Sequence, residues 1–141
     1  MNKFLCFIMI AIVLSACTEP LVTIPGGRLK GEVASPLASW DAVDDVVQLE
    51  MQPTDPYSVN VWAVTTGGQL YVGTGNTRWA VMLSADPAVR FKSGGKVYEL
   101  TAETVHAESE LAAIRQAYAD KYDYTITNDG EDMRVYRLAN R

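Results

Sequence analysis

Few side chains in this sequence can carry out covalent or proton-transfer chemistry. The two cysteines, Cys6 and Cys17, both lie close to the N-terminus, which excludes a disulfide framework and a cysteine-based zinc site. His106 is the one histidine of the chain, so a Ser-His-Asp triad and a histidine-rich metal centre are both unfavourable interpretations. We interpret His106 as a solvated residue of a loop between a strand and a helix.

Carboxylates gather in a pattern that could bind a cation. One group consists of Asp41, Asp44 and Asp45, and the residues that could join it come much later in the chain: Asn128, Asp129, Glu131 and Asp132. Their spacing does not fit an EF-hand loop, which alternates its ligands over about twelve residues. A solvated acidic face is the favoured interpretation, and no metal site is predicted.

Polar side chains between positions 74 and 79 could hold an anion. The residues are Thr74, Asn76, Thr77, Arg78 and Trp79. A helix is predicted to begin at Thr77, and a helix start offers free N–H groups and a partial positive charge. A hydroxyl at the cap and a guanidinium in the first turn would add further donors. Each residue also has a purely structural interpretation, since Thr77 is a good cap, Arg78 suits a surface and Trp79 can fill a core.

Composition sets the class of protein. The chain has 141 residues, 48% of them hydrophobic and 21% charged, which is typical of one globular domain rather than a disordered polymer. Its net charge of −5 comes without any basic block. Nucleic-acid binding is therefore not expected, because phosphate contacts need clustered Lys and Arg.

The N-terminal residues have the pattern of an export signal. A short basic start ending at Lys3 is followed by an unbroken apolar run from Phe4 to Leu14. As a helix this run would rise about 16 Å, which is too short for a hydrocarbon core of about 30 Å. The run is therefore interpreted as a signal peptide rather than a transmembrane helix. It ends in Leu14-Ser15-Ala16-Cys17, which resembles the lipobox of bacterial lipoproteins; a plain secretory signal is the alternative.

The lipobox resemblance implies a processed and anchored chain. Residues 1–16 would be removed, and Cys17 would carry a diacylglycerol that attaches the protein to a membrane of the cell envelope. Residues 17–27 would form the lipidated tether and residues 28–141 a single domain. Thr18 follows the cysteine where lipoproteins kept at the inner membrane tend to have Asp. The expected location is therefore the outer membrane, facing the periplasm, if the cell has one.

Alternating hydrophobicity and turn dipeptides predict an antiparallel α+β domain. The expected strands, with a strand start at 31–33, are 46–51, 58–65, 69–74, 88–92, 96–105, 124–127 and 133–138. The expected helices are 77–85 and 108–122; Leu111, Ile114 and Tyr118 form the apolar stripe of the second. Gly67-Gly68 predicts one hairpin, and Asn128-Asp129-Gly130 predicts another between the last two strands. Six or seven short strands with two helices suggest a barrel-like sheet.

The middle of the chain carries a second resemblance. The stretches are Leu70-Tyr71-Val72-Gly73-Thr74, Asn76-Thr77-Arg78-Trp79 and Leu83-Ser84-Ala85-Asp86-Pro87-Ala88-Val89-Arg90-Phe91. With the segments 95–100 and 117–122, they resemble the split β-barrel flavoproteins, which include pyridoxamine-phosphate-oxidase-like proteins and deazaflavin-dependent nitroreductases. The segments 95–100 and 117–122, together with Val105, resemble an uncharacterised branch of that superfamily.

This resemblance implies a fold and a cofactor site. In flavin-binding members a Ser or Thr followed by a basic residue binds the FMN phosphate, which places Thr77 and Arg78 at the phosphate, with Thr74 and Asn76 beside them. Trp79 would either wall the isoalloxazine or fill the mouth of the barrel. It stands where many relatives have a second basic residue. Because such barrels often bind cofactor between subunits, the resemblance also implies a homodimer.

Two functions are consistent with these features. The first is an envelope lipoprotein whose domain is a binding or structural module with no catalysis of its own, acting with an envelope partner that the sequence does not identify. The second is an FMN- or deazaflavin-binding redox protein similar to nitroreductases and oxidases. An exported protein would have to acquire FMN after export, which favours the first.

Overall fold

The computed structural model describes residues 20, 24–125 and 133–141. The predicted signal segment and Cys17 lie outside the described residues, and so does the predicted turn at Asn128-Asp129-Gly130. Within the described residues, no helix is both long enough and apolar enough to cross a bilayer.

The described strands and helices follow the predicted order closely. The strands are β1 (Glu32–Val33), β2 (Val47–Met51), β3 (Tyr57–Val61), β4 (Ala63–Thr66), β5 (Gln69–Thr74), β6 (Ala88–Ser93), β7 (Lys96–Thr104) and β8 (Arg134–Asn140). The helices are α1 (Arg78–Ala85) and α2 (Glu108–Tyr122). The bounds of β5 and α2 are those that the sequence predicts.

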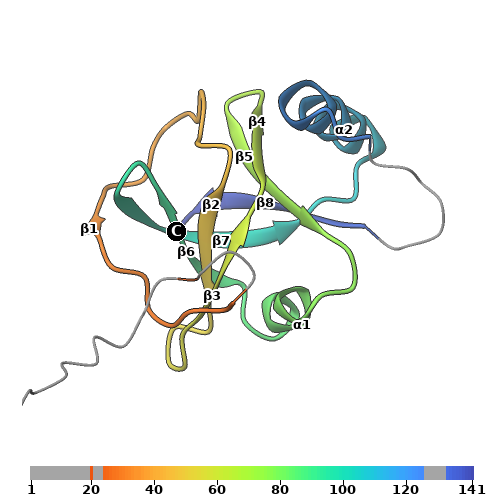
Figure 1. Cartoon of the computed structure of the whole chain (residues 1–141). Coiled ribbons are helices and arrows are strands. Elements are labelled where there is room, and N and C mark those ends of the chain that lie inside the picture. Colours follow the sequence, from red (N-terminus) through yellow and green to blue (C-terminus); the bar gives the residue numbers. More distant parts are fainter. Residues whose placement is uncertain (1–19, 21–23, 126–132) are drawn as a thin grey trace, which may run out of the picture.

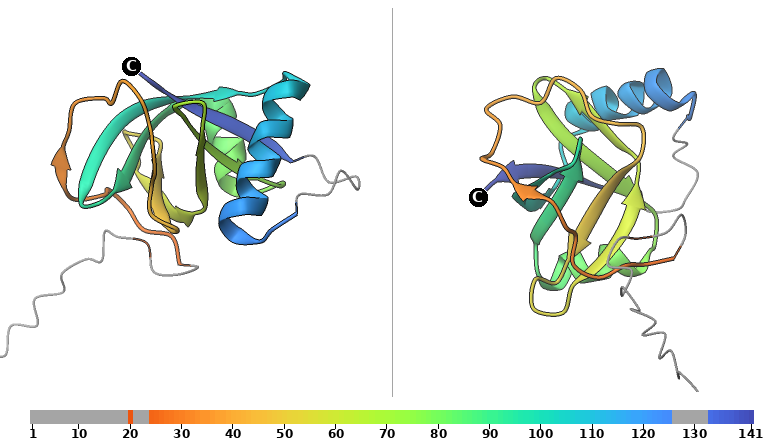
Figure 2. Two further views of the ribbon diagram at one scale, coloured as in Figure 1. Left: turned by 90° about the horizontal axis from the view of Figure 1, so that it is seen from above. Right: turned by 60° about the vertical axis from the view of Figure 1, so that its left-hand side comes forward.

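One curled sheet contains all of the described strands. Its order is β3-β2-β6-β7-β8-β5-β4, every pair along this path is antiparallel, and β1 adds a short parallel pairing to β7. The two ends of the path, β3 and β4, are consecutive in the chain and separated only by Trp62. The sheet therefore curls into a barrel that is split between β3 and β4 (Figures 1 and 2). The predicted fold class, an α+β split β-barrel, is confirmed.

The predicted continuous strand 58–65 is broken at Trp62. Val61 pairs with Val47 of β2, whereas Ala63 pairs with Val72 of β5, on the other side of the split. The chain must leave one ladder and enter another at this point. Alternating hydrophobicity cannot show such a break, because both halves keep the same period of two.

The sequence predicts that the last strand pairs with residues 124–127 in a hairpin, but β8 pairs with other strands. This strand pairs with β5 along one edge and with β7 along the other. Tyr124 and Thr125 are not in a strand, and residues 126 and 127 of the predicted partner lie outside the described residues. β8 therefore joins two strands that are distant in sequence, which is a long-range pairing that a local turn signal does not reveal.

The tight turn between β4 and β5 is as predicted. Gly67 and Gly68 both have positive φ, +58° and +75°. Two consecutive residues in this region are typical of the type I′ hairpin turn, which glycine adopts without steric cost. The N–H of Trp40 donates to the carbonyl of Gly68 at 2.9 Å, which attaches the 34–46 segment to this hairpin.

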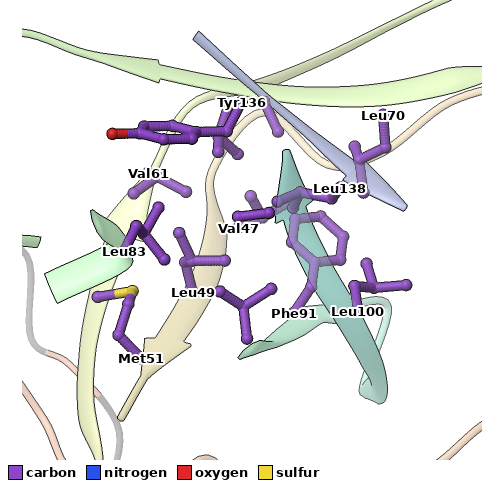
Figure 3. Close-up of a cluster of buried hydrophobic side chains, with 14 of the residues drawn as sticks. Val47, Leu49, Met51, Val61, Leu70, Leu83, Phe91, Leu100, Tyr136 and Leu138 are labelled. Atoms are coloured by element: carbon purple, nitrogen blue, oxygen red, sulfur yellow. The ribbon is translucent and has the colours of Figure 1, made fainter. Parts of the chain in front are cut away.

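The interior of the barrel is filled with apolar side chains. Leu49, Phe91 and Leu100 from three strands are fully buried there, and Leu83 of α1 closes one end (Figure 3). A second, smaller cluster around Ile114 lies between the sheet and α2. Figure 1 shows α1 and α2 at different ends of the curled sheet. The barrel is thus a packed core, and ligands can reach its outer surface and its loops rather than its interior.

Candidate anion-binding site at the start of helix α1

The loop after β5 brings two threonine hydroxyls together. Thr74 ends β5, and Thr77 takes the cap position of α1 with an extended backbone, φ −106° and ψ 160°. The Thr77 hydroxyl makes no capping hydrogen bond to the helix; it lies 3.0 Å from the hydroxyl oxygen of Thr74. One of the two hydroxyls donates to the other, and the remaining lone pairs and hydrogen are available to a ligand.

Arg78 begins the helix and is exposed. Its guanidinium carbon lies 4.9 Å from the centroid of the Tyr57 ring on β3, which is a cation–π distance. The first turn of α1 has no acidic side chain. The positive end of the helix dipole is therefore not compensated by a neighbouring carboxylate of the same turn.

Trp79 is buried in the protein, whereas Asn76 is exposed to solvent. Trp79 is only 8% exposed, belongs to the interior cluster and packs at 6.1 Å against the ring of Tyr136. Of its two predicted roles, the packing matches the filling of the barrel. Asn76 is exposed in the loop. The structure thus brings together Thr74 and Thr77, places Arg78 next to them in sequence, and turns Trp79 inward.

This group of residues can bind but is poorly equipped for catalysis. It offers hydroxyls, a guanidinium and the free N–H groups of a helix start, which together suit a phosphate or another anion. None of the five predicted residues has a carboxylate, an imidazole or a thiol. The group therefore supplies positive charge and hydrogen bonds, and no general base.

The other predicted candidates are separated from this group. His106 is exposed between β7 and α2. Asp41, Asp44 and Asp45 are exposed, and one Asp44 oxygen accepts hydrogen bonds from Ser93 and from the N–H of Gly94. No group of three or more His, Cys, Asp or Glu among the described residues could hold a metal ion.

Sequence reasoning missed a groove between α2 and β4. Its volume is about 530 Å³, and it is lined by Asp41, Ala42, Val43, Val64, Thr65, Thr66, Ala113, Gln116, Ala117, Asp120 and Lys121. The Lys121 ammonium donates to three backbone carbonyls, those of Val43, Asp44 and Ala63, at 2.9 to 3.0 Å. Burial lowers its pKa, against the raising effect of Asp45 and Asp44. No local signal distinguishes this lysine from a surface lysine.

A second missed cluster attaches α2 to the outer face of the sheet. Nη2 of Arg137 on β8 lies 2.7 and 2.8 Å from the two Glu110 oxygens, and Nε donates to one of them at 3.1 Å. The Tyr71 hydroxyl donates to the same carboxylate at 2.7 Å. These hydrogen bonds, from Tyr71 first and then Arg137, lower the pKa of Glu110. Burial and the Glu110 contact raise the pKa of Tyr71. These residues are far apart in sequence, so no local sequence motif predicts that they lie together.

Comparison with known proteins identifies the fold. No protein-family model matches the chain, and no curated protein matches it. A candidate pyridoxamine 5′-phosphate oxidase from Listeria innocua is similar in structure, with a TM-score of 0.57, 17% identity, and coverage of 68% of this chain and 83% of that chain. A conserved hypothetical protein from Mycobacterium tuberculosis has the same TM-score with 19% identity, covering 70% of this chain and 74% of the other.

A third solved structure adds a flavoprotein to this group. An FAD-binding protein from Mesorhizobium loti matches with a TM-score of 0.52 and 14% identity, over 70% of this chain and 82% of that one. At such low identities the likeness is one of architecture. The chain has the split β-barrel fold of the pyridoxamine-phosphate-oxidase-like proteins.

Proposed function

We propose that this protein is a lipid-anchored protein of the cell envelope, and that its split barrel is a binding or structural module without catalysis of its own. The observation that supports this function best is the packed interior. Leu49, Phe91 and Leu100 are fully buried inside the barrel, and Trp79 is buried in the same cluster. Ligands or partners would therefore bind at the outer surface.

The anchor is proposed from the sequence of residues 1–17. Cys17 follows an apolar run and two small residues, and the described domain begins soon after it, with Pro20 and then Ile24. A diacyl anchor supplies the two chains that stable membrane attachment requires. The absence of Asp at position 18 supports the outer membrane, facing the periplasm.

Acylation can be tested on the full chain in a bacterial host. We expect the wild type to incorporate labelled palmitate and to sediment with membranes, and Cys17→Ala to do neither. Cys6→Ala is the matched control, because it removes the other cysteine of the same segment and should leave both results unchanged. Equal palmitate labelling of Cys17→Ala and wild type would contradict the proposed anchor.

A second candidate function is an FMN- or deazaflavin-binding redox protein. It is favoured by the contact between the Thr74 and Thr77 hydroxyls at the start of α1. The residues present fit a cofactor phosphate, because the Thr74 and Thr77 hydroxyls meet at the start of the helix and Asn76 and Arg78 adjoin Thr77 in the chain. A bound flavin would supply hydride transfer; the chain's own residues would hold its phosphate. A likeness to an FAD-binding protein supports this candidate, and it would function as a homodimer.

A flavin titration of residues 18–141 separates the two candidates. Under the second, we expect saturable binding of FMN in the micromolar range or tighter and a loss of binding of about tenfold or more in Arg78→Ala, since a charged hydrogen bond contributes about 1.5–3 kcal/mol. Arg115→Ala is the control, because Arg115 pairs with Glu108 on the surface of α2. If the folded wild type does not bind FMN, the redox candidate is wrong and the binding module remains.

A further inference from the structure

An exposed aromatic patch lies where the chain passes from β3 to β4. Trp62 is 45% exposed, Tyr124 is 50% exposed and Val46 is 55% exposed. The ring of Tyr124 meets that of Trp62 edge-on, with centroids 5.7 Å apart. Val46 and Trp62 directly flank the last residue pair of the β2–β3 ladder, Val47 and Val61. These three residues, Val46, Trp62 and Tyr124, are called the aromatic patch below.

The ring beneath the aromatic patch is held rigidly. Trp62 stacks on Tyr122 with centroids 4.6 Å apart and planes at 8°. The Tyr122 hydroxyl lies 2.7 Å from the carbonyl oxygen of Asp45 and 2.9 Å from that of Ala63, and it accepts the Ala63 N–H at 3.1 Å. A tryptophan fixed in this way keeps much of its apolar surface in water, which is unfavourable unless a partner covers it.

The start of the described chain lies on the same face of the barrel. The Asn60 side chain donates to the carbonyl of Pro20 at 3.5 Å. Val61 and Ala63 both belong to the interior cluster, so Asn60 and Trp62, which alternate with them, lie on the outer side of the barrel. Their Cα atoms are two residues and no more than about 7 Å apart. Cys17 is three residues before Pro20 and can be no more than about 11 Å from it. An acyl anchor on Cys17 would therefore hold this face close to the bilayer.

We propose that the aromatic patch rests in the headgroup layer of the membrane that holds the Cys17 lipid. The inference rests on the lipidation proposed above. Indole and phenol rings combine an apolar body with a polar edge, and they favour the membrane–water interface for that reason. The two acyl chains retain the protein, and the aromatic patch sets which face of the barrel is turned to the lipid.

The charges around the aromatic patch specify the kind of lipid contact. Asp45 and Asp123 are exposed beside it, whereas the nearby Lys121 ammonium is bound to three backbone carbonyls. Among the described residues that adjoin the aromatic patch in the chain, none is a lysine or an arginine that could attract anionic headgroups. Zwitterionic lipid should be sufficient, and added anionic lipid should not strengthen the contact.

Tryptophan fluorescence can test this contact in the full, acylated chain. Trp62 is the exposed tryptophan, while Trp40 and Trp79 are buried and provide a constant background. The protein is reconstituted into phosphatidylethanolamine–phosphatidylcholine vesicles, with and without phosphatidylcholine brominated in its acyl chains. We expect brominated lipid to quench the wild type, Trp62→Phe to lose this quenching, and acrylamide quenching of Trp62 to be lost in vesicles.

Matched variants test the composition of the aromatic patch. Val46→Ser combined with Tyr124→Ser should restore acrylamide access to Trp62, whereas Val81→Ser, which removes an exposed valine on α1, should not. Labelled palmitate is measured in the same samples. If the chain is not acylated, the proposed anchor fails; if it is acylated and Trp62 stays as accessible as in the Cys17→Ala chain, the membrane contact alone is overturned. Protection that depends on protein concentration in detergent would assign the aromatic patch to a second copy and overturn it as well.

Discussion

Glu50 and Arg90 form a buried ion pair on the outer side of the barrel wall. They are 1% and 8% exposed, and the Arg90 guanidinium lies 2.9 Å from one Glu50 oxygen. The same oxygen accepts the N–H of Leu29 at 2.6 Å, and Arg90 donates to the Leu29 carbonyl at 3.1 Å. This pair therefore attaches the segment around Leu29 to the centre of the sheet. The other Glu50 oxygen has no hydrogen bond, and Arg28 approaches it at 3.6 Å.

Replacing one residue of this ion pair should lower the free energy of unfolding more than replacing both residues with apolar ones. Arg90→Met leaves the buried carboxylate with only the Leu29 N–H and the more distant, half-exposed Arg28, and we expect it to lower the free energy of unfolding by about 3 kcal/mol. The double variant Glu50→Leu, Arg90→Met should recover much of this loss. Urea unfolding measures both. Arg115→Met, which breaks an ion pair on the surface of α2, should cost less than about 1 kcal/mol; an equally small cost for Arg90→Met would contradict the buried pair.

Glu110 makes the stability of the fold depend on pH. Its hydrogen bonds from Tyr71, and then from Arg137, lower its pKa in the folded state. Its contribution is therefore present above the ordinary carboxyl pKa and is lost as the pH falls through the lower folded-state pKa. We expect Glu110→Gln to reduce stability at pH 7 and to flatten the acid limb of a plot of urea midpoint against pH. Glu108→Gln on the same helix is the control, and an acid limb as steep in Glu110→Gln as in wild type would refute this role.

At the scale of elements, the C-terminal end of α2 is a second place, besides Glu110, at which this helix is attached to the rest of the fold. Lys121 bonds the carbonyls of Val43, Asp44 and Ala63, and Tyr122 bonds those of Asp45 and Ala63. Both residues come from the last turn of the helix, so one turn connects α2 to β4 and to the segment before β2.

Loss of the Lys121 ammonium should loosen that segment. In Lys121→Met the carbonyls of Val43 and Asp44 lose the ammonium that donates to them, whereas that of Ala63 keeps the Tyr122 hydroxyl. We expect a destabilisation of about 1–3 kcal/mol, the usual cost of leaving a buried group unsatisfied. Hydrogen exchange should accelerate in residues 43–46 and at β4 more than in β7. Lys96→Met, at the exposed start of β7, is the control. Uniformly faster exchange in all strands would mean that the lysine stabilises the whole fold rather than this attachment.

The sequence predicts the local elements well and their long-range pairing poorly. The bounds of α2 follow from the spacing of Leu111, Ile114 and Tyr118, and the turn at Gly67-Gly68 follows from its residue types, because these signals are local. The break at Trp62 and the two partners of β8 depend on strands far away in the chain. For the candidate site, sequence predicts that Thr77 begins a helix, but the contact with Thr74 and the inward position of Trp79 require the folded loop.

At the scale of the whole molecule, the barrel interior and the cluster under α2 share strands. Tyr71 belongs to the cluster under α2, and its neighbour Leu70 belongs to the interior. The two clusters lie on opposite faces of the same β5 strand, so neither can lose its packing alone without disturbing the other.

We therefore expect a single unfolding transition for the two clusters. Leu49→Ala in the interior and Ile114→Ala under α2 should each lower the free energy of unfolding by about 2–5 kcal/mol. For each variant, the unfolding midpoint followed by tryptophan fluorescence should equal the midpoint followed by far-ultraviolet circular dichroism. Val81→Ala, on the exposed side of α1, is the control. Two separate transitions in Ile114→Ala would show that α2 docks as an independent unit.

The position of β8 decides when this protein can fold. β8, which comes last among the described strands, lies inside the sheet, between β5 and β7, and not at its margin. A chain that has emerged only as far as α2 presents two unpaired strand edges, the kind of surface that pairs with other chains. The sheet closes only after residues 134–140 are free, so a product truncated before them would remain open to proteases. The two halves of the sheet thus stay unjoined until residues 134–140 take their place between them.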